Sequence, residues 1–153
     1  MIRLAEKNDF CQLAEMRWQH FVEDDITYGE NNITGVDKQK FIDEYISFLN
    51  YDTSYNIFVM EQEGIIISAM YVAMIRKVPK PKESDSYIAY LTNVHTLQEY
   101  RNMGKGTELL TYIRNYLKEK KCELIIVWPS DNSVDWYARN GFASENDVME
   151  CEL

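Results

Sequence analysis

The stretch from residue 91 to residue 110, LTNVHTLQEYRNMGKGTELL, constrains the fold of this chain more than any other part. Its pattern predicts the end of a strand, a tight glycine-bearing loop and the start of a helix. The loop at 101–107 carries two glycines and two cations. Because the first amides of a helix have no partner within the helix, such a loop is a typical anion site. The stretch therefore predicts a phosphate or pyrophosphate cradle.

Side chains of the same loop favour this interpretation. Arg101 and Lys105 would add positive charge, and arginine can bind phosphate through two parallel hydrogen bonds. Gly104 and Gly106 would let the backbone approach the anion closely. The loop is neither a P-loop nor a dinucleotide fingerprint, because GxxxxGK[ST] and GxGxxG are both absent. The alternative is a plain strand-to-helix turn, whose glycines only ease the corner.

Two motifs connect the chain to a known family. The spacing Arg101-x-x-Gly104-x-Gly106 resembles the [QR]-x-x-G-x-[GA] signature of the GNAT superfamily of N-acetyltransferases, which binds the pyrophosphate of acetyl-CoA. The later segment WYARNGF resembles the family's second landmark, a tyrosine four residues before a Gly-Phe pair. The resemblance implies acetyl-CoA as cosubstrate. It implies that the cofactor contacts Val94, His95, Thr96, Arg101, Asn102, Met103, Gly104, Lys105, Gly106, Thr107 and Ser130.

The order of the predicted elements fits one α+β domain over residues 1–153, with a central mixed, mostly antiparallel sheet flanked by helices. The expected strands are 2–5, 55–61, 65–78, 87–96, 124–128 and 148–153. The expected helices begin at Asn8 or Asp9, at Asp37, at Lys105 and at Ser133, and 23–32 is expected to be an acidic loop. The helical crossover predicts that strands 87–96 and 124–128 are parallel. The continuous apolar run of the second predicts burial on both faces. In the resembled fold these two strands splay apart, and the pantetheine arm lies between them.

Composition excludes several classes of function. A net charge of −9 argues against a nucleic-acid partner and agrees with a cationic substrate, although an acidic surface can also serve solubility alone. The apolar runs are too short for a membrane span, and the N-terminus lacks a signal pattern, so we expect a cytoplasmic protein without a membrane partner. The three scattered cysteines suit free thiols. Neither histidine has metal-ligand spacing from a cysteine, so no metal is expected.

Acetyl transfer requires an acid, a base and a donor for the oxyanion. Tyr137 matches the family's motif tyrosine, and a phenol with a pKa near ~10 can protonate a thiolate whose thiol pKa is near ~8.5. Alternatively, Tyr137 only packs between its aromatic neighbours. A backbone N–H near Val94 to Thr96 could stabilise the oxyanion. The candidate bases are Glu23, Asp24, Asp25, Asp85 and Glu99, with His95 as a further candidate.

One position departs from the family pattern. Many members carry an asparagine seven residues before the motif tyrosine, whereas this chain has Ser130 there and Asn132 two residues later. A hydroxyl at the end of a strand can contact cofactor or cap the following helix.

The sequence therefore predicts an N-acetyltransferase that moves an acetyl group from acetyl-CoA to a primary amine, by direct attack through a tetrahedral intermediate. The expected acceptor is a small cationic or amino-acid-like molecule, which four acidic residues could meet; these are Glu23, Asp24, Asp25 and Glu30. Those residues could instead simply face water. The alternatives are an acetyltransferase acting on a protein N-terminus or lysine, and a non-catalytic acyl-CoA-binding or sensing module. A C-terminal strand could pair across a homodimer.

Overall fold

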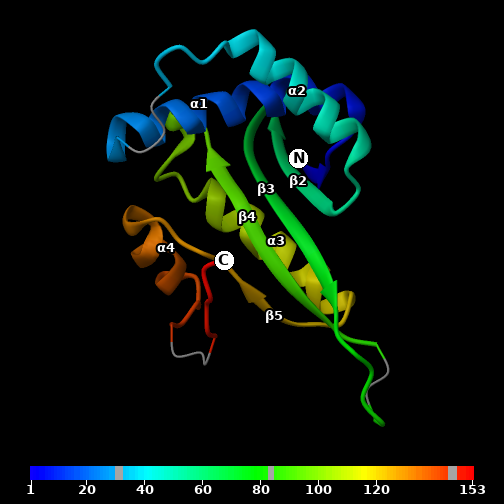
Figure 1. Ribbon diagram of the computed structural model, residues 1–153. Helices are drawn as coiled ribbons and strands as arrows, with labels where there is room; N and C mark the ends of the chain where they lie inside the picture. Colours follow the sequence, from blue (N-terminus) through cyan, green and yellow to red (C-terminus); the bar gives the residue numbers. More distant parts are fainter. Residues whose placement is uncertain (30–32, 83–84, 145–147) are drawn as a thin grey trace.

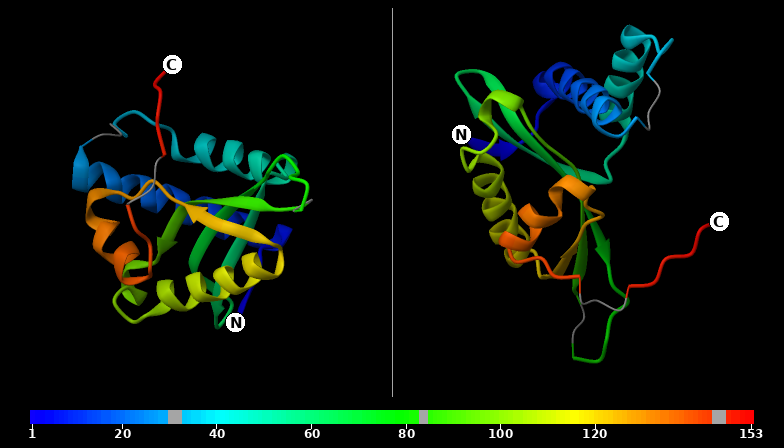
Figure 2. Two further views of the ribbon diagram at one scale, coloured as in Figure 1. Left: turned by 90° about the horizontal axis from the view of Figure 1, so that it is seen from below. Right: turned by 90° about the vertical axis from the view of Figure 1, so that its left-hand side faces the viewer.

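The computed structural model describes residues 1–29, 33–82, 85–144 and 148–153. A five-stranded sheet, in the order β1-β2-β3-β4-β5, lies between α1 and α2 on one face and α3 on the other (Figures 1 and 2). The strands are β1 (Ile2–Leu4), β2 (Tyr55–Gln62), β3 (Ile65–Arg76), β4 (Tyr87–Thr96) and β5 (Cys122–Ile126). The helices are α1 (Phe10–Tyr28), α2 (Lys38–Tyr51), α3 (Lys105–Glu119) and α4 (Val134–Arg139). None of the helices in these ranges is both long and apolar enough to cross a bilayer.

The predicted mixed, mostly antiparallel sheet is confirmed. β1 to β4 pair antiparallel in chain order, and β4 pairs with β5 in parallel, as the helical crossover through α3 requires. α2 begins where expected, because the Asp37 side chain accepts a hydrogen bond of 3.1 Å from the Lys40 backbone N–H.

The two faces of the sheet follow the alternation of the strands. Phe58, Met70 and Val72 point toward α3, whose buried stripe packs on them. That stripe consists of Leu109, Leu110, Ile113 and Leu117, at helical spacing. The intervening residues Val59 and Tyr71 point the other way, toward α1 and α2.

One prediction for α1 is wrong. The segment Glu23–Tyr28 belongs to the helix, not to an acidic loop, and Glu30, Asn31 and Asn32 lie outside the described residues. The helix continues until Gly29, which ends it in the left-handed conformation at φ +68°. The predicted start of the helix at Asp9 is confirmed, since Asp9 is the N-cap residue of α1, but its side chain accepts no capping hydrogen bond. Its carboxylate accepts hydrogen bonds from Arg3 at 2.6 and 2.9 Å and from the Glu6 N–H at 2.7 Å.

Two predictions near the C-terminus are also wrong. β5 is not buried on both faces, because in the sheet formed by the described residues it is an edge strand paired with β4, and Leu124 is 44% exposed. Residues 148–153 do not form a closing strand: Glu150 accepts a hydrogen bond from the Trp128 indole N–H, and the end of the chain projects outward (Figure 2). Val148 and Met149 are exposed there, so their apolar character reflects no burial in this chain.

Candidate active site

β4 and β5 separate as the chain proceeds toward the end of β4. Their pairing runs from Tyr87 opposite Cys122 to Tyr90 opposite Ile126, and β4 then continues without β5 to Thr96 (Figure 1). The expected splay between these strands is therefore present. It leaves the last part of β4 with one free side, next to the loop that begins α3.

Glycine is needed at the two positions of that loop for different physical reasons. Gly104 precedes α3 at φ +76°, and a Cβ built there would meet no atom within 4 Å. Gly106 lies against other elements, since a Cβ there would come within 3.4 Å of the Trp136 ring and 3.5 Å of the Thr96 hydroxyl oxygen. Gly104 thus exposes the helix N-terminus to open space, while Gly106 lets α3 approach β4 and α4 closely.

Both cations of the loop already have carboxylate partners. Arg101 pairs with Glu23 of α1, and its Nε donates a 2.8 Å hydrogen bond to the Thr96 carbonyl. Lys105 lies 3.6 Å from Glu108 one turn along α3. Arg101 therefore fixes the loop to the end of β4 and to α1. The amides of the first turn of α3, including those of Lys105 to Thr107, remain the natural donors to an anion.

β4 has a bulge on the splayed stretch. Tyr71 of β3 pairs with Thr92 and Ala69 pairs with His95, so Asn93 and Val94 together face a single residue of β3. Asn93 has φ +45°, in the left-handed region that few non-glycine residues adopt. A bulge leaves backbone groups outside the regular ladder and re-aims them. The bulge therefore lies within the stretch from which an oxyanion donor was expected.

Tyr137 lies in the core that covers the α3 face. Its ring packs edge-on against Trp136 and Phe142, with centroids 4.8 and 5.2 Å away, and the residue is 6% exposed. Burial raises the pKa of Tyr137 to about 12, so its hydroxyl is protonated at neutral pH. Among the described residues, no side chain is hydrogen-bonded to that hydroxyl. The ring therefore packs between its aromatic neighbours, as the alternative interpretation expects. The hydroxyl is still protonated and can donate a hydrogen bond.

Ser130 does not cap the following turn with its side chain. Its hydroxyl donates to the Ser133 hydroxyl at 3.1 Å, while its carbonyl accepts from the Ser133 N–H at 2.9 Å and from the Ser133 hydroxyl at 2.8 Å. The capping role considered for this hydroxyl is therefore wrong. Met103 and Asn102 are exposed in the loop, and the Val94 side chain packs toward the α3 face.

His95 points to the opposite face and is poorly suited to accept a proton. It is 6% exposed and stacks on His20 of α1, with ring centroids 4.7 Å apart. Burial, with added repulsion from His20, Arg101 and Arg17, lowers the pKa of His95 to about 3. A base that weak gains little from abstracting a proton near neutral pH.

The acidic candidates for the base also differ in position. Asp85 precedes β4, whereas Val94 lies seven residues beyond Tyr87, about 23 Å along an extended strand. Glu23 is held by Arg101, and the Asp24 carboxylate lies 3.5 Å from His20 Nε2. Asp85 is therefore too far from Val94 to act as the base there. Glu23 and Asp24 belong to α1, on the face of the sheet opposite α3.

A polar network beside the bulge was missed at the sequence level. Arg17 Nη1 donates to Asn93 Oδ1 at 3.3 Å, Asn93 Nδ2 donates to the Tyr45 hydroxyl at 3.3 Å, and that hydroxyl donates to Tyr71 at 3.0 Å. Two signals could have revealed it. Asn is unfavourable inside a strand, and Arg17 follows Leu13 by one helical turn on the buried stripe of α1.

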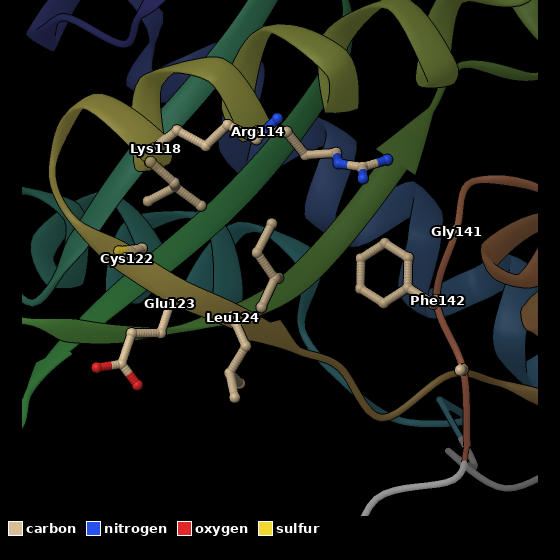
Figure 3. Close-up of a pocket in the computed structure, with 10 residues that line it drawn as sticks. Arg114, Lys118, Cys122, Glu123, Leu124, Gly141 and Phe142 are labelled. Carbon is tan, nitrogen blue, oxygen red and sulfur yellow. The ribbon is translucent and has the colours of Figure 1, made fainter.

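One cavity among the described residues lies elsewhere, between the second half of α3, β5 and residues 141–143 (Figure 3). Its volume is about 370 Å³. Arg114, Lys118 and Glu123 line it, together with Leu124 of the sheet edge, and no residue of the 101–107 loop does so. The cavity reflects the uncovered edge of β5 and is separate from the splayed end of β4. The described side chains contain no group of three or more potential metal ligands.

Comparison with known proteins gives a consistent result. A family model described as "Acetyltransferase (GNAT) family" matches residues 13–142. No curated protein matches significantly. Among solved structures, the chain is similar to a predicted acetyltransferase with acetyl-CoA from Clostridium acetobutylicum, at TM-score 0.72 and 20% identity, covering 99% of this chain and 95% of the other. It is also similar to glucosamine-6-phosphate N-acetyltransferase from Arabidopsis thaliana, at TM-score 0.68 and 17% identity, covering 99% and 97%. At these identities the similarity shows the fold.

Proposed function

The chain belongs to the acetyltransferase (GNAT) family, and from this premise we propose that it transfers an acetyl group from acetyl-CoA to a primary amine of a small molecule. The observation that carries the proposal is the coincidence of three features at one end of β4. The strand parts from β5, bulges at Asn93 and Val94, and meets the open N-terminus of α3. A thioester with a diphosphate tail needs this combination of a slot, a donor and an anion site.

The chain's own residues fit acetyl-CoA. The N–H groups from Lys105 to Thr107 would bind the pyrophosphate, and the open space beside Gly104 would admit it without a clash. The uncovered side of β4 offers backbone groups to an extended arm. A donor at Val94 would stabilise the oxyanion as the amine nitrogen bonds to the acetyl carbon. When the carbon–sulfur bond breaks, the Tyr137 hydroxyl would give its proton to the sulfur, while a carboxylate or water accepts the amine proton.

Acetyl-CoA binding is tested by thermal unfolding with and without the ligand. At about a hundred times its dissociation constant, acetyl-CoA should stabilise the protein by roughly 2.7 kcal/mol. Gly104→Glu should abolish this effect, because it places a negative side chain at the helix N-terminus. The matched control is Gly64→Glu in the β2–β3 turn, which has the same left-handed backbone at φ +80° and the same open surroundings.

The two variants separate strain from binding. Both should lower the unfolding temperature of the free protein, and only Gly104→Glu should lose the response to acetyl-CoA. A folded wild type without any response would overturn the proposal. Release of free thiol with an amine then distinguishes a transferase from a non-catalytic acyl-CoA-binding module.

A further inference from the structure

Arg17 is a half-buried cation without an acidic partner among the described residues. Toward the described residues its hydrogen-bond contacts are made by Nη1, 3.3 Å to Asn93 Oδ1 and 3.4 Å to His20 Nδ1. A guanidinium has five N–H donors, so most of its capacity is unused. Two other arginines behave differently, since Arg3 binds Asp9 and Arg101 binds Glu23.

No ion pair joins Arg17 to a carboxylate of the described residues. Three carboxylates follow it on α1: Glu23 pairs with Arg101, Asp24 lies 3.5 Å from His20 Nε2, and Asp25 also has a partner. The other polar groups of the network, on Tyr45, Tyr71 and Asn93, carry no charge at neutral pH. Burying a cation without a counter-charge is costly, so this arrangement leaves a local positive potential that a bound anion would satisfy.

The position of Arg17 connects this potential to the chemistry. Its partner Asn93 directly precedes Val94 in the bulge of β4, and consecutive Cα atoms are about 3.8 Å apart. A group held by Arg17 therefore lies a short distance from the point where the acetyl carbon would be attacked. Arg17 also lies on the face of the sheet opposite α3, because α1 covers that face. An acceptor bound there would approach β4 from the side opposite the α3 N-terminus, where the pyrophosphate is proposed to bind.

We propose that the acceptor amine carries an anionic group, a carboxylate or a phosphate, and that Arg17 binds this group beside Val94. The proposal rests on the proposed function and specifies its acceptor as amino-acid-like or phosphorylated. An anion there would accept hydrogen bonds from the free guanidinium nitrogens, with Asn93 and Tyr45 fixing the side chain's direction. A polyamine lacks such a group and would meet repulsion from Arg17.

Direct binding is measured first, on protein saturated with CoA, so that the helix N-terminus is already occupied. Sodium acetate and sodium phosphate are added in separate thermal unfolding series, with sodium chloride at equal ionic strength as reference. One of the two anions should raise the unfolding temperature of the wild type more than chloride does. The anion that does so shows whether the site prefers a carboxylate or a phosphate. Arg17→Met should lose this gain. Arg76→Met, at the far end of β3 beside Asp85, should keep it.

Turnover is measured next, by thiol release with pairs of amines that differ in one charge. Amino acids are compared with their amides, and ethanolamine phosphate with ethanolamine. Wild type should prefer the anionic amine of each pair. Arg17→Met should raise the KM for that anionic amine about tenfold or more, while the KM for acetyl-CoA stays unchanged. Arg17→Lys should restore part of the preference.

The outcomes separate the two proposals. Equal stabilisation by acetate, phosphate and chloride, or an anion effect that survives Arg17→Met, overturns the anion site. So does a wild-type preference for the neutral amine. If the anion effect depends on Arg17 but no amine releases thiol, the transferase proposal fails and the anion site stands.

Discussion

The two faces of the sheet use the same strands for different purposes. The α3 face packs carbon on carbon, with Ile113 and Leu110 of α3 against Phe58 and Met70 of the sheet. The α1–α2 face encloses a polar network around Tyr71 and the stacked histidines. The α3 face thus carries the larger apolar cluster, whereas the α1–α2 face adds the polar network to a smaller apolar cluster, and the proposed acceptor site lies there. Substitutions should consequently separate into those that unfold the protein and those that alter its reaction.

The largest expected effect lies on the α3 face. Ile113→Ala removes a fully buried side chain and should lower the free energy of unfolding by about 2–5 kcal/mol, measured by denaturant titration. Asn115→Ala on the exposed side of the same helix should change it by less than about 0.5 kcal/mol. Similar losses for both variants would contradict the assignment of this core.

Tyr137 is the proposed proton donor, and it lies on the carbon-rich face. Tyr137→Phe keeps the ring and removes the proton donor, so kcat should fall about 100-fold while acetyl-CoA still stabilises the protein. Tyr116→Phe, whose ring packs on Phe58 in the same core, should leave kcat unchanged. An unaltered kcat in Tyr137→Phe would show that the residue only packs.

The histidines should make the polar face sensitive to acid. Burial lowers the pKa of His95 to about 3, so between that value and about 6.5 the unfolded chain binds a proton that the folded chain does not. Stability should therefore fall as pH drops, by up to about 1.4 kcal/mol per unit, or about 2 kcal/mol at pH 5. His95→Phe should flatten this dependence in unfolding titrations from pH 8 to pH 5.

The carboxyl group of Asp9 does not interfere with this measurement. Its hydrogen bond with Arg3 lowers its pKa below 3.8, so its contribution is lost only at more acidic pH. His20, whose pKa burial also lowers, acts in the same direction as His95. An undiminished slope in His95→Phe would assign the acid sensitivity to other groups.

The smallest effect is expected within the network itself. Tyr71→Phe removes the 3.0 Å hydrogen bond with Tyr45 and should cost about 1 kcal/mol of unfolding free energy. Tyr90→Phe, on the same sheet and packed against Trp128, removes a hydroxyl outside the network and should cost less. Equal costs would mean that the network adds no stability.

The success of the sequence-based predictions differs between the apolar packing of the sheet and its polar network. Period and spacing predicted β4, the hairpin of β2 and β3, the apolar stripe of α3 and the loop at its start, because burial of carbon leaves a repeating pattern. The network of Arg17 and Asn93 joins positions 76 residues apart, and no local pattern reports such a contact. The exposed edge of β5 escaped for a related reason, since an apolar strand looks the same whether or not a neighbour covers it.

Asn93 has a consequence for the variation that the protein tolerates. Its left-handed backbone favours Gly, Asn or Asp, and its side chain must both accept from Arg17 and donate to Tyr45. Glycine would suit the backbone and lose both bonds, and aspartate would accept from Arg17 but could no longer donate to Tyr45 while ionised. A library randomised at position 93 should therefore contain few active variants, nearly as few as a library randomised at a catalytic nucleophile. This holds although Asn93 forms no covalent bond. Efforts to change the acceptor should begin at positions 17 and 45 and leave position 93 fixed.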